Sequence, residues 1–219
     1  MSNLIKNGHI VHNEWTLVSL PALAEEAVRK QAGKVVIFKI TGEPAATPEQ
    51  IADTQIPASG KILVPQPVWL ARKDELLPRL QAGELGVWLE SFELIEDLVA
   101  SVDNINQLPV IAVNFPRFAD GRGFSIATLL RTRFGYTNEI RAIGDVLRDQ
   151  LYYMKRCGFH AYLMRPDRST PEALASLRDF TEPYQGAVDN PLPVWRRYTR
   201  VAHHAATGKA EATHEDTVD

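Results

Sequence analysis

Two consecutive strand–loop–helix units occupy the middle of the chain. Val110–Phe115 is a continuous apolar run that is typical of a buried strand, and a glycine-rich loop and a helix over 125–134 are predicted to follow it. A second strand over Glu139–Gly144 and a second helix over 145–157 repeat the pattern. Because each helix returns the chain to the end where the strand began, successive units build a parallel sheet. This stretch therefore predicts an α/β fold.

The same alternation extends to both sides of this stretch. Further strands are predicted over 35–40, 62–64, 85–90 and 159–164, and further helices over 22–31, 48–53, 69–80, 92–105, 170–180 and 194–205. That gives six candidate parallel strands joined by helices. A barrel-like closure, or an incomplete (β/α) barrel, is slightly favoured over an open doubly wound sheet.

The domain prediction is a single α/β domain over 1–205, with an edge hairpin over 1–18 and a disordered tail over 206–219. A formal net charge of −3 gives no reason to expect nucleic acid as a partner. No apolar run has the length of a membrane helix, and no signal peptide is recognisable, so we expect a cytoplasmic protein without a membrane partner. The one cysteine, Cys157, excludes an intrachain disulfide and a Cys-only cluster site.

Ligands in both candidate folds bind beyond the carboxyl ends of the parallel strands. The residues expected at that edge are Glu90, Asn114, Phe115, Asp120, Arg122, Asp145 and Arg165.

A local excess of arginine in this region predicts an anion site. Ser125 and Asp145 are predicted to cap the two central helices, and a helix N-terminus attracts anions. The predicted anion-binding residues are Arg122, Gly123, Ser125 and Arg141. Asp120 and Asp145 would organise the arginines, or one of them would act as a general base in catalysis. Arg141 has an alternative interpretation as a buried salt bridge, for which Glu139 is a candidate partner.

Several other site types receive no support from the sequence. The six histidines do not have metal-ligand spacing, so no metal site is predicted. Neither a dinucleotide or nucleotide-triphosphate loop nor a Gly-x-Ser-x-Gly elbow occurs, and the sequence identifies no cofactor.

Three runs of the sequence carry a family signature. They are F-P-R-F-A-D-G-R-G-F-S-I-A-T-L-L-R at 115–131, E-I-R-A-I-G-D-V-L-R-D-Q at 139–150 and C-G-F-H-A-Y at 157–162. With V-P-Q-P-V-W-L at 64–70, they resemble an uncharacterised bacterial family, the domain of unknown function nine-three-four. Its members are often labelled as probable oxidoreductases involved in sulfite reduction.

The resemblance implies an accessory role in assimilatory sulfate and sulfite reduction, with sulfite reductase or phosphoadenylyl-sulfate reductase as partner. The protein would bind a sulfur oxyanion or a phosphorylated metabolite, or assist the reductase. Two alternatives remain open. One is a barrel-type lyase or isomerase with an aspartate base and an arginine electrophile. The other is a non-catalytic interaction module that uses the hairpin or the surface around Tyr152 and Tyr153.

Overall fold

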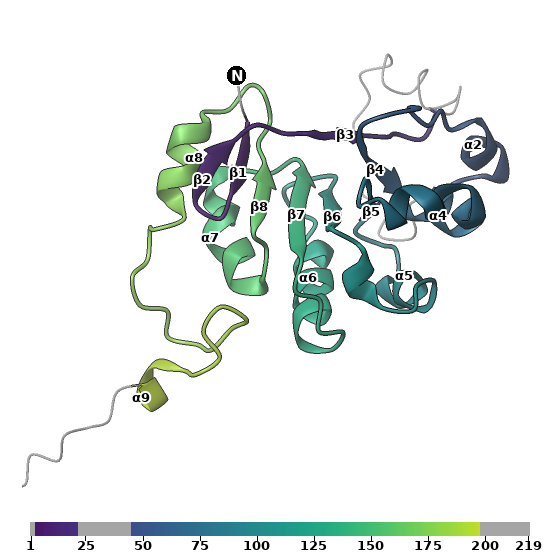
Figure 1. Ribbon diagram of the computed structural model, residues 1–219. Coiled ribbons are helices and arrows are strands. Elements are labelled where there is room, and N and C mark those ends of the chain that lie inside the picture. The colour runs from purple at the N-terminus through teal and green to yellow at the C-terminus, as the bar shows by residue number, and fades with distance from the viewer. Residues whose placement is uncertain (1–2, 22–44, 198–219) are drawn as a thin grey trace, which may run out of the picture.

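The computed structural model describes residues 3–21 and 45–197, and its central feature is one eight-stranded sheet (Figure 1). The strands lie in the order β2-β1-β8-β7-β6-β5-β4-β3. Their bounds are β1 Leu4–Lys6, β2 His9–Val11, β3 Trp15–Leu17, β4 Lys61–Pro65, β5 Leu85–Leu89, β6 Val110–Phe115, β7 Glu139–Gly144 and β8 Ala161–Leu163. Neighbouring strands from β3 to β8 are parallel, whereas β1 is antiparallel to both β2 and β8.

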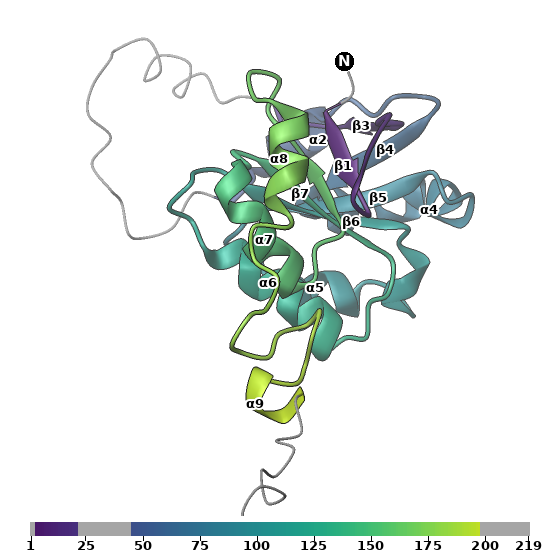
Figure 2. The same ribbon diagram turned by 90° about the vertical axis from the view of Figure 1, so that its left-hand side faces the viewer.

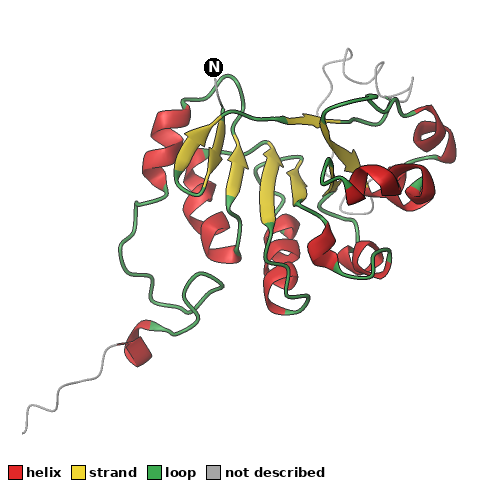
Figure 3. Ribbon diagram, viewed as in Figure 1, coloured by secondary structure: helices red, strands yellow, loops and turns green. Residues whose placement is uncertain are grey.

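Most of the helices cover the outer face of this sheet, whereas the last short helix lies away from it (Figure 3). Their bounds are α2 Pro48–Asp53, α3 Gln66–Ala71, α4 Lys73–Gln81, α5 Ile95–Ala100, the 3-10 helix η1 Ile105–Gln107, α6 Arg122–Thr132, α7 Arg148–Cys157, α8 Thr170–Ser176 and α9 Val194–Arg197. Their apolar side chains join those of the outward-facing strand residues in one large core. A second, smaller core on the inner face contains strand residues only.

A short connection forces the sheet to curl. Strands β2 and β3 lie at opposite edges of the sheet, yet only residues 12–14 separate Val11 from Trp15. Four residue steps reach at most about 14 Å, whereas the edge strands of a flat sheet of this size would lie about 34 Å apart. The sheet is therefore bent into a half-barrel, and the chain crosses from one edge to the other at its open side (Figure 1).

Small residues make room for large ones on the inner face. Gly86 and Ala112 lie there in the middle strands, beside Trp88. A Cβ on Gly86 would come within 2.6 Å of both the Leu63 side chain and a backbone oxygen. The Trp88 indole, on the same face, donates to the carbonyl of Val18, which follows the edge strand β3. The inner face is thus filled by side chains and is not an open channel.

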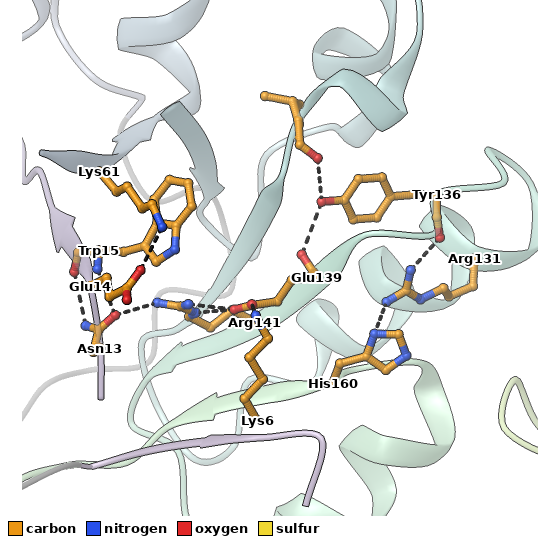
Figure 4. Close-up of polar contacts among 11 residues, drawn as sticks. Lys6, Asn13, Glu14, Trp15, Lys61, Arg131, Tyr136, Glu139, Arg141 and His160 are labelled. Atoms are coloured by element: carbon orange, nitrogen blue, oxygen red, sulfur yellow. Dashed lines mark hydrogen bonds and ion pairs between the residues drawn. The ribbon is translucent and has the colours of Figure 1, made fainter. Parts of the chain in front are cut away.

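A buried ionic network also holds the curled sheet together (Figure 4). Arg141, on the inner face of β7, is 1% exposed and donates from Nε to Glu139 Oε1 at 2.7 Å. Its Nη1 donates to Asn13 Oδ1 at 2.9 Å, and Lys6 Nζ lies 2.7 Å from Glu139 Oε2. The network therefore joins β1, β7 and the short connection between β2 and β3.

The sequence predictions of the fold are largely confirmed. The barrel-like α/β arrangement and the N-terminal hairpin are present, and β6 and β7 have the predicted bounds. The predicted helix over 22–31, the strand over 35–40 and the tail over 206–219 lie outside the described residues. The last predicted helix is described only over Val194–Arg197.

Both predicted helix caps are wrong. Helix α6 begins at Arg122 with Gly121 as N-cap, so Ser125 is an exposed residue within the helix. Helix α7 begins at Arg148 with Leu147 as N-cap, because Asp145 is held elsewhere. The Asp145 N–H donates to the Phe115 carbonyl at 2.7 Å, and its carboxylate binds an arginine.

Two predicted helices are also wrong in extent. The helix over 69–80 is two helices, α3 and α4, which meet at Arg72. In place of the helix predicted over 92–105, the structure has the shorter helix α5. The helix begins later than predicted because residues 90–93 form a hydrogen-bonded turn.

The Arg141 network yields a test of stability. Arg141→Met leaves one side of the buried Glu139 carboxylate unpaired and removes one of the two hydrogen bonds that Asn13 Oδ1 accepts, so we expect a loss of about 3–5 kcal/mol in the free energy of unfolding. The double variant Glu139→Gln/Arg141→Met should recover part of that loss. Arg133→Met is the control, since Arg133 and Glu96 form an exposed pair that is worth about 1 kcal/mol or less. Equal losses for Arg141→Met and Arg133→Met in urea unfolding would contradict this role.

Candidate functional site

Polar side chains meet where the parallel strands end, as the sequence predicts. Glu90 directly follows β5 and Asn114 lies near the end of β6, and Asn114 Nδ2 donates to Glu90 Oε2 at 2.8 Å. Arg165 follows β8, and its Nη1 donates to Asp145 Oδ1 at 2.7 Å. Residues from neighbouring loops are therefore joined in pairs along this carboxyl edge.

Hydrogen bonds to Asp120 hold the loop between β6 and α6 in place. Asp120 accepts a hydrogen bond from Ser91 Oγ at 2.5 Å, and bonds from the backbone N–H, Nε and Nη2 of Arg122 at 3.1, 2.9 and 2.6 Å. These Arg122 bonds lower the pKa of Asp120 to about 2, against the effect of burial. A carboxylate that stays ionised to such low pH is a weak base, so Asp120 has a positioning role.

Glu93 is the titratable group at this edge that the sequence prediction missed. Its Oε2 accepts the Glu90 N–H at 2.8 Å, which places the two carboxyl groups on one tight turn. Burial raises the pKa of Glu93 to about 7, and repulsion by Glu90 adds to the rise. Glu93 can therefore gain or lose a proton at neutral pH. The sequence signal for Glu93 is an acidic residue three positions after Glu90, the acid at the end of a strand. The helix predicted over 92–105 included Glu93, so this signal was not recognised.

An arginine from the start of α6 packs on this turn. The Arg122 guanidinium lies over the Phe92 ring, with its central carbon 5.9 Å from the ring centre, and Phe92 directly precedes Glu93. Ser91 connects the same turn to Asp120. We call the group of Glu90, Glu93, Asn114, Asp120 and Arg122 the carboxyl-edge cluster. It combines a neutral-pH acid with a half-exposed positive charge.

The four residues predicted to bind one anion have separate environments. Arg122 binds Asp120, whereas Arg141 binds Glu139 and Asn13 on the inner face of the sheet. A Cβ on Gly123 would come within 2.7 Å of the Phe115 ring, so this glycine serves close packing of α6 on the sheet. Ser125 is exposed, and Asp145 pairs with Arg165 and not with Arg141.

Two observations limit other kinds of site. Within the described ranges, no group of three or more His, Cys, Asp and Glu side chains is arranged to hold a metal ion. None of the helices in that part of the chain has both the length and the apolar character needed to cross a membrane.

The fold and the carboxyl-edge cluster define a half-barrel α/β protein with an acid–base group at the rim. Residues 86–195 match the profile of a family described as a bacterial protein of unknown function, DUF934. The match covers 110 of the 219 residues, and the chain belongs to this family. The matched region begins within β5 and includes the whole carboxyl-edge cluster. A comparison with curated protein sequences gives no match.

The raised pKa of Glu93 predicts a pH-dependent stability. Its pKa is about 7 in the folded protein and 4.5 as the ordinary value, so the folded state binds the proton more tightly. The associated stabilisation is complete below about pH 4.5 and is lost as pH rises through about 7. Since Glu93→Gln stays neutral, we expect this variant to gain stability relative to the unmodified protein between pH 5 and pH 8 in urea unfolding. Glu84→Gln, at an exposed carboxylate, is the control, and a Glu93→Gln difference that is constant with pH would contradict the assignment.

Proposed function

We propose that the protein is an accessory protein of assimilatory sulfite reduction that binds a small oxyanion at its carboxyl-edge cluster. The ligand would be a sulfur oxyanion or a phosphorylated metabolite. The observation that carries the proposal is the tight turn that places the Glu93 carboxyl group beside Glu90, with the Arg122 guanidinium over Phe92 of the same turn. Burial in this turn raises the pKa of Glu93 to about 7, so the group is partly protonated at neutral pH. The link to sulfite reduction comes from the resemblance of the sequence, and a sulfite reductase partner is part of the proposal.

The chemistry of binding follows from the charges at the cluster. A protonated carboxyl group donates a hydrogen bond to an anion, whereas an ionised one repels it. Arg122, at the start of α6, lies over Phe92 of this turn and supplies positive charge that would compensate the anion, and Asp120 fixes the direction of its guanidinium. An oxyanion would therefore bind together with a proton on Glu93.

The half-barrel lyase or isomerase remains as a second candidate, because the same Glu93 pKa suits a general base at neutral pH. Glu93 would then take the role that the sequence suggested for Asp120 or Asp145. Replacement of a hydrogen of the bound ligand by deuterium from D₂O distinguishes these two candidate functions. Exchange that requires Glu93 supports the enzyme, and binding without exchange supports the accessory protein.

A ligand panel tests the proposal. Sulfite, sulfate, adenylyl sulfate and sugar phosphates are titrated into the protein by calorimetry. We expect one of these to bind, and Arg122→Ala to weaken that binding at least tenfold, since it removes the compensating charge. Arg117→Ala, which changes an exposed arginine of the same loop, is the matched control and should have little effect.

The same titration repeated across pH tests the role of Glu93. If a proton is taken up with the ligand, affinity falls by up to about tenfold for each pH unit above 7. The Glu93→Gln variant should lose most of this pH dependence. The absence of binding to every anion in the panel, or binding that Arg122→Ala leaves unchanged, would refute the proposed function.

A further inference from the structure

A cavity lies against the N-terminal hairpin, at the end of the parallel strands opposite to the carboxyl-edge cluster. It has a volume of about 330 Å³ and lies between the Asn7–Gly8 turn, the residues before β8 and the ends of α7 and α8. The Asn7 N–H donates to the His160 carbonyl at 2.9 Å, which fixes the turn beside the start of β8. Figure 2 shows the hairpin strand β1 beside α8. We call this cavity the hairpin pocket.

The rim of the hairpin pocket carries positive charge without compensation. Lys155 and Arg178 line it, and neither forms an ion pair or a side-chain hydrogen bond with any residue in the described part of the chain. Among those residues, no carboxylate lines the pocket. Two positive charges on one rim without a nearby carboxylate favour a bound anion.

A pocket at the carboxyl end provides a contrast. It has a volume of about 350 Å³ and is lined by Arg148 and Arg168, together with three acidic residues. Arg148 lies 3.4 Å from Glu172 and Arg168 lies 3.6 Å from Asp167. The charges in that pocket are compensated by the protein itself, whereas those of the hairpin pocket are not.

His160 adds a neutral donor to the hairpin pocket. Arg131 Nη2 lies 2.9 Å from His160 Nδ1, and because arginine can only donate, Nδ1 is the acceptor and Nε2 carries the proton (Figure 4). Arg131 is itself anchored to the carbonyls of Gly158 and Tyr136. Burial, and then the charge of Arg131, lowers the pKa of His160, so the ring stays neutral at pH 7.

The end of α7 does not oppose an anion at this place. A free helix C-terminus would present carbonyl oxygens with partial negative charge. Here the Met154 carbonyl accepts from Phe159 N–H at 3.1 Å and the Lys155 carbonyl accepts from Gly158 N–H at 3.0 Å. Gly158 has a φ of +106°, a conformation that closes the helix in this way.

The floor of the hairpin pocket is apolar. Phe159, Tyr162, Leu174 and Leu177 form it, and the Tyr162 hydroxyl is already bonded to the Phe159 carbonyl at 3.1 Å. A bare inorganic ion would leave this surface without a partner. The volume is in the range of sites for small organic molecules.

We propose that the hairpin pocket binds a small organic anion, with its acidic group between Lys155, Arg178 and His160 Nε2 and its apolar body on the floor of the pocket. A phosphate monoester or a carboxylate on an aromatic or branched aliphatic group has the required chemistry. The site is separate from the carboxyl-edge cluster, so this proposal can be tested independently of the proposed function.

Titration calorimetry of the full chain with phenyl phosphate, inorganic phosphate and benzyl alcohol tests this proposal. We expect phenyl phosphate to bind at least tenfold more tightly than either of the others. It alone has both an acidic group for the positively charged rim and an apolar ring for the floor. Arg178→Ala and Lys155→Ala should each weaken it about tenfold. Both residues are exposed, so the fold should tolerate the changes, and circular dichroism verifies this.

Two control variants locate the binding. Arg148→Ala changes the contrasting pocket and should bind phenyl phosphate as the unmodified protein does, whereas Arg122→Ala shows whether any of the ligand binds at the carboxyl-edge cluster. The proposal is overturned if phenyl phosphate does not bind, if inorganic phosphate binds equally well, or if Arg178→Ala has no effect. Loss of binding in Arg122→Ala alone would assign the ligand to the carboxyl-edge cluster instead.

Discussion

The connection of three residues between β2 and β3 is the constraint on which the rest of the structure depends. It joins the two edges of an eight-stranded sheet, so the sheet has to curl. The bond between Arg141 and Asn13 holds this connection against the inner face, and Glu139 neutralises the buried guanidinium. The curl gives the sheet an inner face filled by strand side chains and an outer face covered by helices. It also brings the ends of the parallel strands onto one rim, where the loops can contact each other.

The Arg141 network and the carboxyl-edge cluster have different physical roles because their charges are balanced differently. Glu139 lies between Arg141 and Lys6, so its buried charge is compensated and serves stability. Glu93 instead lies beside a second carboxylate, Glu90, and the turn offers its carboxylate a backbone N–H. Burial without a compensating cation disfavours the ionised form, which is how a surface loop acquires a group that titrates near neutral pH.

The sequence predicts most of the fold because strong periodic signals are local. The apolar runs of β6 and β7 need no distant contact to be recognised, and their ends place Asn114 and Asp145 at the correct edge. The predicted cap at Ser125 is wrong because α6 already begins at Arg122, and the predicted cap at Asp145 is wrong because its carboxylate binds Arg165, a competition that residue type alone does not show. Strand alternation places Arg141 on the inner face with Glu139, but the contact with Asn13, 128 residues away in sequence, depends on the curl.

The central claim is that the carboxyl-edge cluster contains a carboxyl group that exchanges a proton at neutral pH. Carbon-13 NMR titration of the glutamate carboxyl groups measures this directly, with the Glu93→Gln spectrum to assign the signal. The structure predicts a midpoint of about 7 for Glu93. A midpoint near the ordinary value of 4.5 would contradict the account, because Glu93 would then be fully ionised at neutral pH and could not donate a hydrogen bond to an anion.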